Sequence, residues 1–146
     1  MAIITKRYMD REIAMECLYL IVDDKRLDMI ESGLETKVYL ALDPFWASII
    51  LGKPVLNRKC EVVGAIPAAE WEFDALKRRG GDIILEIWKG DLVIKNFRRV
   101  VFSGSSFYTK GKRVAFRIEG IIIGKGEPGC GDPENDGFII KLGRRI

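Results

Sequence analysis

Apolar and polar residues along the first third of the chain follow the spacings of short strands and helices. Residues 16–22 form an apolar, β-rich run that predicts a buried strand. Residues 23–33 combine capping acids, apolar residues at helical spacing and a closing glycine, which predicts a short helix. Residues 36–43 alternate strictly, so we expect a strand with Lys37 and Tyr39 on the same face.

The middle of the chain carries two further helix signals. Asp43 and Pro44 begin a helix that Gly52 should end. Residues 67–79 predict another helix, opened by a proline, because its acids come early and its bases late, as the helix dipole favours. A short strand is expected between these helices, at residues 60–65.

From residue 82 onward the pattern indicates strands. Residues 82–88 and 91–95 flank a tight Lys-Gly connection, which predicts a hairpin. Further strands are expected at 98–102, 112–119, 121–123 and 137–142. The glycine-rich segment 124–136 reads as a long ordered turn or a lid. Short strands with a few helices predict an α+β fold with a curled sheet or small barrel.

Composition is that of one globular domain. The chain has 146 residues, of which 48% are hydrophobic and 31% charged. Residues 1–15 show no clear period and are interpreted as an arm or short helix. No apolar run approaches a membrane span of ~20 residues, and the N-terminus lacks a secretory pattern. We therefore expect a cytoplasmic protein with no membrane partner.

The chemistry available to the chain is limited. Histidine is absent, and the three cysteines are far apart, which excludes His-activated nucleophiles, His-based metal sites and a disulfide framework. The acids Glu127, Asp132, Glu134 and Asp136 lack calcium-loop spacing and are interpreted as solvated. We expect no metal and no cofactor. Trp88 lies in an apolar pattern and is expected in the core.

One polar loop combines aromatic and basic side chains. Phe107 and Tyr108 are followed closely by Lys110, Lys112 and Arg113. Aromatic rings that stack on bases, next to cations that contact phosphates, are typical of nucleic-acid-binding surfaces. The alternative is an ordinary solvated loop, and a net charge of only +3 gives no strong electrostatic signal.

Several stretches together resemble the small ASCH-domain proteins of bacteria, mobile elements and phages. These are Leu18 to Gly33, Tyr39 to Trp46, Ile118 to Pro128 and Gly137 to Gly143. The resemblance implies a PUA-like fold, a small mixed β-barrel with helices packed at its openings and a polar cleft. Residues 16–146 would then be a single ASCH domain with an insertion at about 53–96.

The chain departs from the family pattern at the positions that the resemblance places in the cleft. Glu35 stands where the family usually has lysine, and Leu40 where it has arginine, while Tyr39 is retained. The family's Arg-containing segment after the central strand reads Ser-Gly-Ser-Ser at 103–106. Losing an arginine removes a fixed charge and five donors. This favours a protein that is not an enzyme.

The leading hypothesis is a non-catalytic module that binds RNA or a nucleotide. Tyr39 and the two loop aromatics would stack on bases, and the three loop cations would contact phosphates. One alternative is a hydrolase of modified nucleosides or RNA, in which Lys37 supplies a cation or base, Glu35 transfers protons and Tyr39 donates a hydrogen bond. The other is a phage or mobile-element factor that inhibits a host protein, using the segment 67–95.

Overall fold

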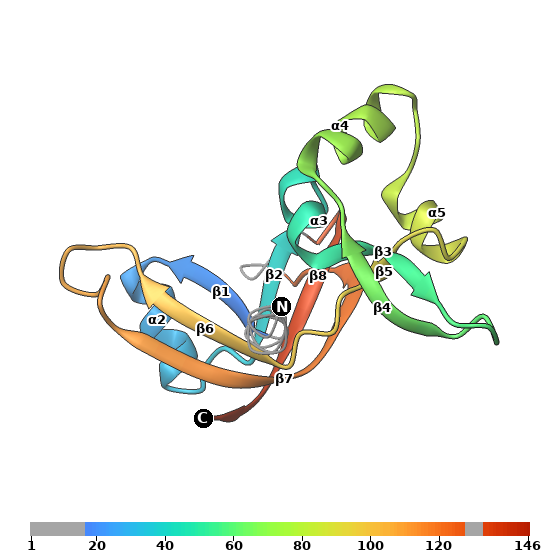
Figure 1. Cartoon of the computed structure of the whole chain (residues 1–146). Coiled ribbons are helices and arrows are strands. Elements are labelled where there is room, and N and C mark those ends of the chain that lie inside the picture. The colour runs from blue at the N-terminus through green and yellow to red at the C-terminus, as the bar shows by residue number, and fades with distance from the viewer. Residues whose placement is uncertain (1–16, 128–132) are drawn as a thin grey trace. The chain divides into compact units, whose positions relative to one another are not determined.

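A computed structural model describes residues 17–127 and 133–146 and shows a mixed α+β protein (Figure 1). The expected α+β class is confirmed. The described strands are β1 (Cys17–Val22), β2 (Lys37–Ala41), β3 (Leu51–Leu56), β4 (Val62–Pro67), β5 (Val93–Ile94), β6 (Arg99–Gly104), β7 (Arg113–Lys125) and β8 (Asp136–Arg145). The described helices are α2 (Asp24–Glu31), α3 (Pro44–Ile50), α4 (Glu70–Arg78) and α5 (Ile83–Trp88). None of these helices is long and apolar enough to cross a membrane.

Within the described residues the strands form two sheets. The larger sheet is curled and has the order β1-β6-β7-β8-β2, and the smaller has the order β4-β3-β5. β1 runs parallel to β6, while β6 and β7 are antiparallel. β3 pairs antiparallel with both β4 and β5.

The chain divides into two compact units that alternate along the sequence. The described part of the first unit is 17–39, 96–122 and 139–146, and the second comprises 40–95, 123–127 and 133–138. The segment 53–96, interpreted as an insertion, falls almost entirely in the second unit. The expected arm at 1–15 lies outside the described residues.

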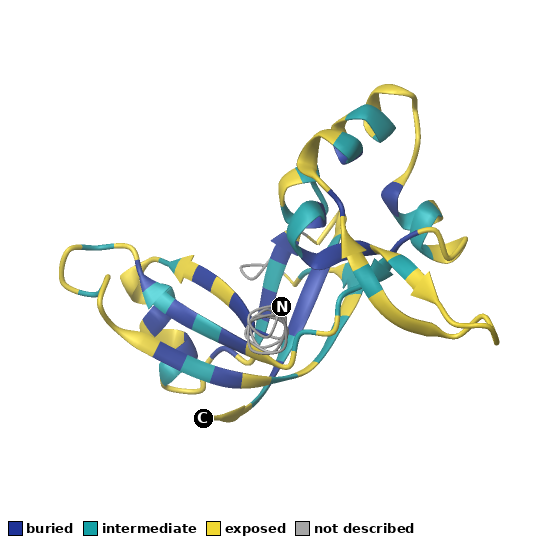
Figure 2. Ribbon diagram, viewed as in Figure 1, coloured by how far each residue is buried: buried dark blue, intermediate teal, exposed yellow. Residues whose placement is uncertain are grey.

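The core of the first unit forms where α2 packs on the sheet. Asp23 begins this helix, because its Oδ1 accepts a hydrogen bond from the Arg26 backbone N–H at 2.7 Å. Gly33 follows its end with φ of +83°, a conformation that favours glycine. The buried residues of these elements are Leu18, Leu20, Leu27, Ile30, Val100, Phe102, Val114 and Phe116. Figure 2 shows buried bands along the strands of this unit. These side chains hold α2 and the strands β1, β6 and β7 in fixed positions.

The core of the second unit forms where α3 packs against α4 and β3. Asp43 begins α3 as expected, accepting from the Trp46 backbone N–H at 2.9 Å. Phe73 of α4 and Ile50 of α3 are buried. Gly52 does not stop the helix, since α3 ends at Ile50 and β3 begins at once. A Cβ at Gly52 would lie 2.8 Å from the Ile66 carbonyl oxygen, so glycine allows β3 and β4 to pair closely.

The hairpin expected at residues 82–95 is wrong, and only a short strand remains at its end, β5, which pairs with β3. Ile83–Trp88 is the helix α5, with Asp82 as its N-cap accepting from the Ile84 backbone N–H at 2.9 Å. Gly90, with φ of +85°, follows the end of this helix and does not form a hairpin turn. Local capping outweighed the β propensity of an apolar run. Trp88 is 84% exposed, so the expectation that it belongs to the core is also wrong.

Two other boundaries and one burial pattern differ from the sequence prediction. Pro67 ends β4 and does not open α4, whose N-cap is Ala69. The two strands expected at 112–119 and 121–123 are one continuous strand, β7. β1 is not buried on both faces, because Tyr19 and Ile21 are exposed while their neighbours are buried. The sequence does not reveal this alternation of buried and exposed residues, because the residues on both faces of β1 are apolar.

Candidate nucleic-acid interface

The loop that joins β6 to β7, residues 105–112, is compactly folded. The backbone N–H of Lys110 donates to the Ser106 carbonyl at 2.9 Å, and that of Lys112 donates to the Thr109 carbonyl at 2.9 Å. The Ser105 N–H donates to the Val22 carbonyl at 3.0 Å, which fixes the loop's first residue to the end of β1. Because these groups are paired within the protein, the loop has a defined conformation.

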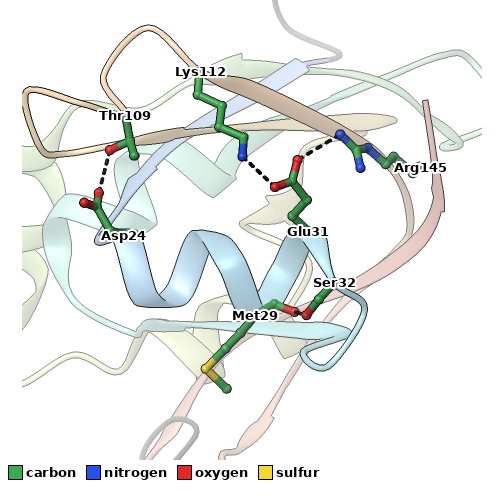
Figure 3. A network of polar contacts seen from close by, with 7 residues as sticks. All are labelled: Asp24, Met29, Glu31, Ser32, Thr109, Lys112 and Arg145. Carbon is green, nitrogen blue, oxygen red and sulfur yellow. Dashed lines mark hydrogen bonds and ion pairs between the residues drawn. The ribbon is translucent and has the colours of Figure 1, made fainter.

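Two side chains of the loop are bound to acids of α2, as Figure 3 shows. The Thr109 hydroxyl donates to Asp24 Oδ1 at 2.5 Å, near the start of the helix. Lys112 Nζ lies 2.6 Å from Glu31 Oε1, at the end of the helix. The other oxygen of Glu31, Oε2, accepts a hydrogen bond from Arg145 Nη2 of β8 at 3.1 Å. Contacts at both ends of α2 therefore hold the loop against the helix.

These contacts favour the charged form of both acids. Hydrogen bonds from the Thr109 and Ser106 side chains lower the pKa of Asp24 below its ordinary value of 3.8. The hydrogen bond from Lys112 lowers the pKa of Glu31 below 4.5, and the charges of Lys112 and Arg145 lower it further. Both carboxylates are therefore ionised at neutral pH.

The tip of the loop presents two aromatic rings to solvent. Phe107 is 79% exposed and Tyr108 is 91% exposed. Their ring centroids are 5.7 Å apart, with an edge-to-face angle of 86°. Lys110 Nζ lies 5.2 Å from the centroid of the Phe107 ring. The tip therefore combines two exposed π faces with one cation.

The other two cations, Lys112 at the end of the loop and Arg113 at the start of β7, have structural contacts. Lys112 forms the ion pair with Glu31, and Arg113 Nη1 donates to the carbonyl oxygens of Lys110 and Lys112 at 2.8 and 3.3 Å. Both side chains are exposed at the surface of the loop. Of the three expected phosphate contacts, Lys110 is the one beside the aromatic tip.

The residues proposed for catalysis do not belong to the loop 105–112. Glu35 is buried, with 7% exposure, and its Oε1 lies 2.5 Å from Arg26 Nη2. Lys37 and Tyr39 are half-buried on β2. In the order of the sheet β8 lies between β7 and β2, so Tyr39 is on a strand that does not border the loop. The structure thus groups Phe107, Tyr108 and Lys110 but does not place Tyr39 on an adjacent strand.

The Arg26–Glu35 pair was not foreseen from the sequence. Nine positions separate the two residues, a distance at which helical spacing makes no prediction. Their pairing gives Glu35 a structural role, which the replacement of the expected lysine by an acid at this position did not suggest.

The described acids of the segment 124–136, which are Glu127, Glu134 and Asp136, do not form a cluster that could hold a metal ion. Among residues 17–127 and 133–146, no three His, Cys, Asp or Glu side chains are placed to hold a metal ion. Asp132 lies outside the described residues. No family model, curated protein or solved structure matches this chain.

Proposed function

We propose that this protein is a non-catalytic nucleic-acid-binding module, with RNA as its first candidate ligand. The observation that carries the proposal is the exposed pair of Phe107 and Tyr108 beside Lys110, on a folded loop. Stacking on such rings contributes ~1–3 kcal/mol per base, and a neighbouring cation can contact phosphate.

The contacts between the loop and α2 support the same proposal. Ordering a flexible loop on binding costs free energy, and a loop that is already folded avoids much of this cost. Asp24 and Glu31 hold this loop before any ligand arrives. The anchoring therefore keeps the aromatic tip in one conformation that is available to a ligand.

A PUA-like fold of the ASCH type is part of this proposal. The mixed α+β class and the curled five-stranded sheet among the described residues are compatible with it. Fold alone does not establish function, and the exposed rings of the loop are the feature that favours binding.

The hydrolase alternative has less support. Its proposed proton-transfer group, Glu35, is buried and paired with Arg26. Because this carboxyl group is buried and its Oε1 is already bound to Arg26, it is poorly placed to exchange a proton with a substrate. If Lys37→Ala abolished a measured turnover of RNA or a modified nucleoside, that result would favour a hydrolase.

The test is a titration of a fluorescent single-stranded RNA with the protein at two salt concentrations. The double variant Phe107→Ala/Tyr108→Ala should weaken binding about 5- to 150-fold or more, the range for one lost stacking contact. Lys110→Ala should weaken binding and reduce the salt dependence, with the slope of log K against log salt falling by about 0.7.

Two matched controls separate the loop from the rest of the surface. Trp88→Ala removes an aromatic ring that is 84% exposed in the second unit, and Lys59→Ala removes an exposed lysine there. Both should bind as the unchanged protein does. Equal losses in the loop variants and the controls would contradict the loop as the binding site, and no binding at low salt would contradict the function.

A second candidate function is a protein-interaction factor, and the β3–β4 hairpin favours it. Val62, Val63 and Ile66 of β4 are 54%, 62% and 55% exposed, and β4 is an edge strand of its sheet. Exposed apolar edge strands are sites where another chain can pair. A bound host protein that Val63→Lys releases and Phe107→Ala retains would support this function.

A further inference from the structure

The face of β1, β6 and β7 that points away from α2 carries mainly aromatic and apolar residues. Residues that oppose each other across neighbouring strands share a face. Tyr19 lies beside Val101, which lies beside Ala115. One step along the sheet, Ile21 lies beside Ser103. These residues alternate with the buried ones that contact α2, so they form the opposite, outer face.

The middle of this outer face is apolar and open to solvent. Tyr19 is 68% exposed and Ile21 is 74% exposed. Val101 and Ala115 are half-buried beside Tyr19. The two exposed side chains lie on β1, and the half-buried Val101 and Ala115 extend the apolar group to β6 and β7. Neighbouring apolar residues that are open to solvent favour a binding surface.

Two arginines stand at one end of the apolar group. Arg99 of β6 is directly opposite Arg117 of β7, and both are exposed. Like charges directly opposite each other destabilise a strand pair, and an anion bound between them would remove that cost. Among residues 17–127 and 133–146, neither guanidinium forms an ion pair with an acid.

The aromatic loop is joined to two of the strands that form this face. β6 ends at Gly104 and β7 begins at Arg113, so residues 105–112 extend from the same two strands. The Arg pair lies where the β6–β7 pairing ends farthest from the loop, and along the register Tyr19 lies between this pair and the loop. The loop itself is held against α2 through Thr109 and Lys112, so the outer face adds a set of contacts that is distinct from those of the loop.

We infer that the outer face of β1, β6 and β7 binds single-stranded nucleic acid, with bases on Tyr19 and Ile21 and phosphates at Arg99 and Arg117. This inference rests on the proposed function and adds the strand state of the ligand and a second set of contacts. The arginines match the charge of the backbone, and the rings match the faces of unpaired bases.

The surface should bind a single strand in preference to a duplex because it exposes aromatic rings, which stack on the faces of unpaired bases. In a duplex the faces of the bases are stacked on each other, and only their edges are accessible in the grooves. Exposed rings of Tyr19, Phe107 and Tyr108 can stack only on bases that are unpaired. A surface that bound duplex would need cations that follow both backbones, not a central apolar group.

The experiment compares one fluorescent RNA of ten nucleotides as a single strand and as a blunt duplex with its complement. The single strand should bind at least about 10-fold more tightly. Tyr19→Ala should weaken single-strand binding about 5- to 150-fold, while Tyr19→Phe, which keeps the ring, should bind normally. Arg99→Ala/Arg117→Ala should reduce the salt slope by about 1.4, two phosphate contacts at ~0.7 each.

The controls are Trp88→Ala and Arg58→Ala, which remove an exposed ring and an exposed arginine from the second unit. Each should leave binding and its salt slope unchanged. If the loop variants lose binding while Tyr19 and the arginines can be replaced without effect, this inference is wrong and the proposed function stands. Equal binding of duplex also overturns the inference, and no binding of either RNA overturns both.

Discussion

At the scale of single residues, side chains of the same type have different uses in one loop. Lys110 lies over the Phe107 ring at the exposed tip. Lys112, two residues later, is paired with Glu31. The sequence presents both as loop lysines, and only their contacts distinguish a cation that is available to a ligand from one that anchors the loop.

Gly104 allows the loop to close, and its replacement is a direct test. A Cβ at this position would lie 1.9 Å from Thr109 Oγ1 and 3.0 Å from the Thr109 carbonyl oxygen. We expect Gly104→Ala to lower the free energy of unfolding by about 1–3 kcal/mol, the usual cost of overpacking, and to weaken RNA binding. Urea denaturation measures the first effect.

The matched control is Gly120→Ala in β7, where an added Cβ meets nothing within 4 Å. This variant should stay within about 0.5 kcal/mol of the unchanged protein. If both substitutions cost the same, the close approach to Thr109 does not determine the loop's stability.

At the scale of elements, α2 has two tasks. Its apolar side, with Leu27 and Ile30, fills the core under the sheet. Its ends, at Asp24 and Glu31, hold the loop through polar contacts with Thr109 and Lys112. The element that stabilises the first unit therefore also positions the proposed binding loop.

The ionised form of Glu31 makes this attachment dependent on pH. Its folded-state pKa lies below the ordinary 4.5, so its stabilising effect is fully present above that value and is lost as pH falls through the folded-state pKa. We expect Glu31→Gln to be less stable than the unchanged protein above about pH 5.5, with the difference shrinking towards pH 3. Urea denaturation from pH 3 to 7 measures it.

Replacing the cations that pair with Glu31 should give the same dependence of stability on pH. Lys112→Ala/Arg145→Ala removes the cations that lower the Glu31 pKa, so its stability should also converge with that of the unchanged protein in acid. A difference that is the same at every pH would show that the ion pairs do not contribute to stability.

At the scale of the whole molecule, the first unit is assembled from distant parts of the chain. Its described residues come from 17–39, 96–122 and 139–146. Phe102 from the second segment is fully buried, and its ring contacts that of Phe116 edge-to-face at 6.2 Å. The stability of this unit therefore depends on long-range apolar contacts, while the proposed ligand contacts lie outside the core.

This separation predicts that stability and binding can be changed independently. Phe102→Ala should lower the free energy of unfolding by about 3–5 kcal/mol, because it leaves a cavity in the core. Phe107→Ala and Tyr19→Ala remove side chains that are 79% and 68% exposed, and should change it by about 0.5 kcal/mol or less. Thermal and urea denaturation check both. Large destabilisation by either surface variant would mean that its effect on binding cannot be interpreted as a lost contact.

Local signals in the sequence predicted several elements correctly. The capping acids at Asp23 and Asp43 and the strict alternation of 36–43 predicted α2, α3 and β2. Each prediction used groups within a few residues of one another, where backbone geometry decides the outcome. The same reasoning failed for residues 83–88, whose apolar run suits either a strand or a short helix.

The sequence by itself determined the α+β class, the main capped helices and the aromatic-basic loop, because these depend on neighbouring residues. The tertiary structure alone decided which side chains of that loop are available. It paired Lys112 with Glu31 across 81 positions and placed Arg99 opposite Arg117. Such pairs depend on strand order and register, which residues far apart in the chain set through the packing of a shared core.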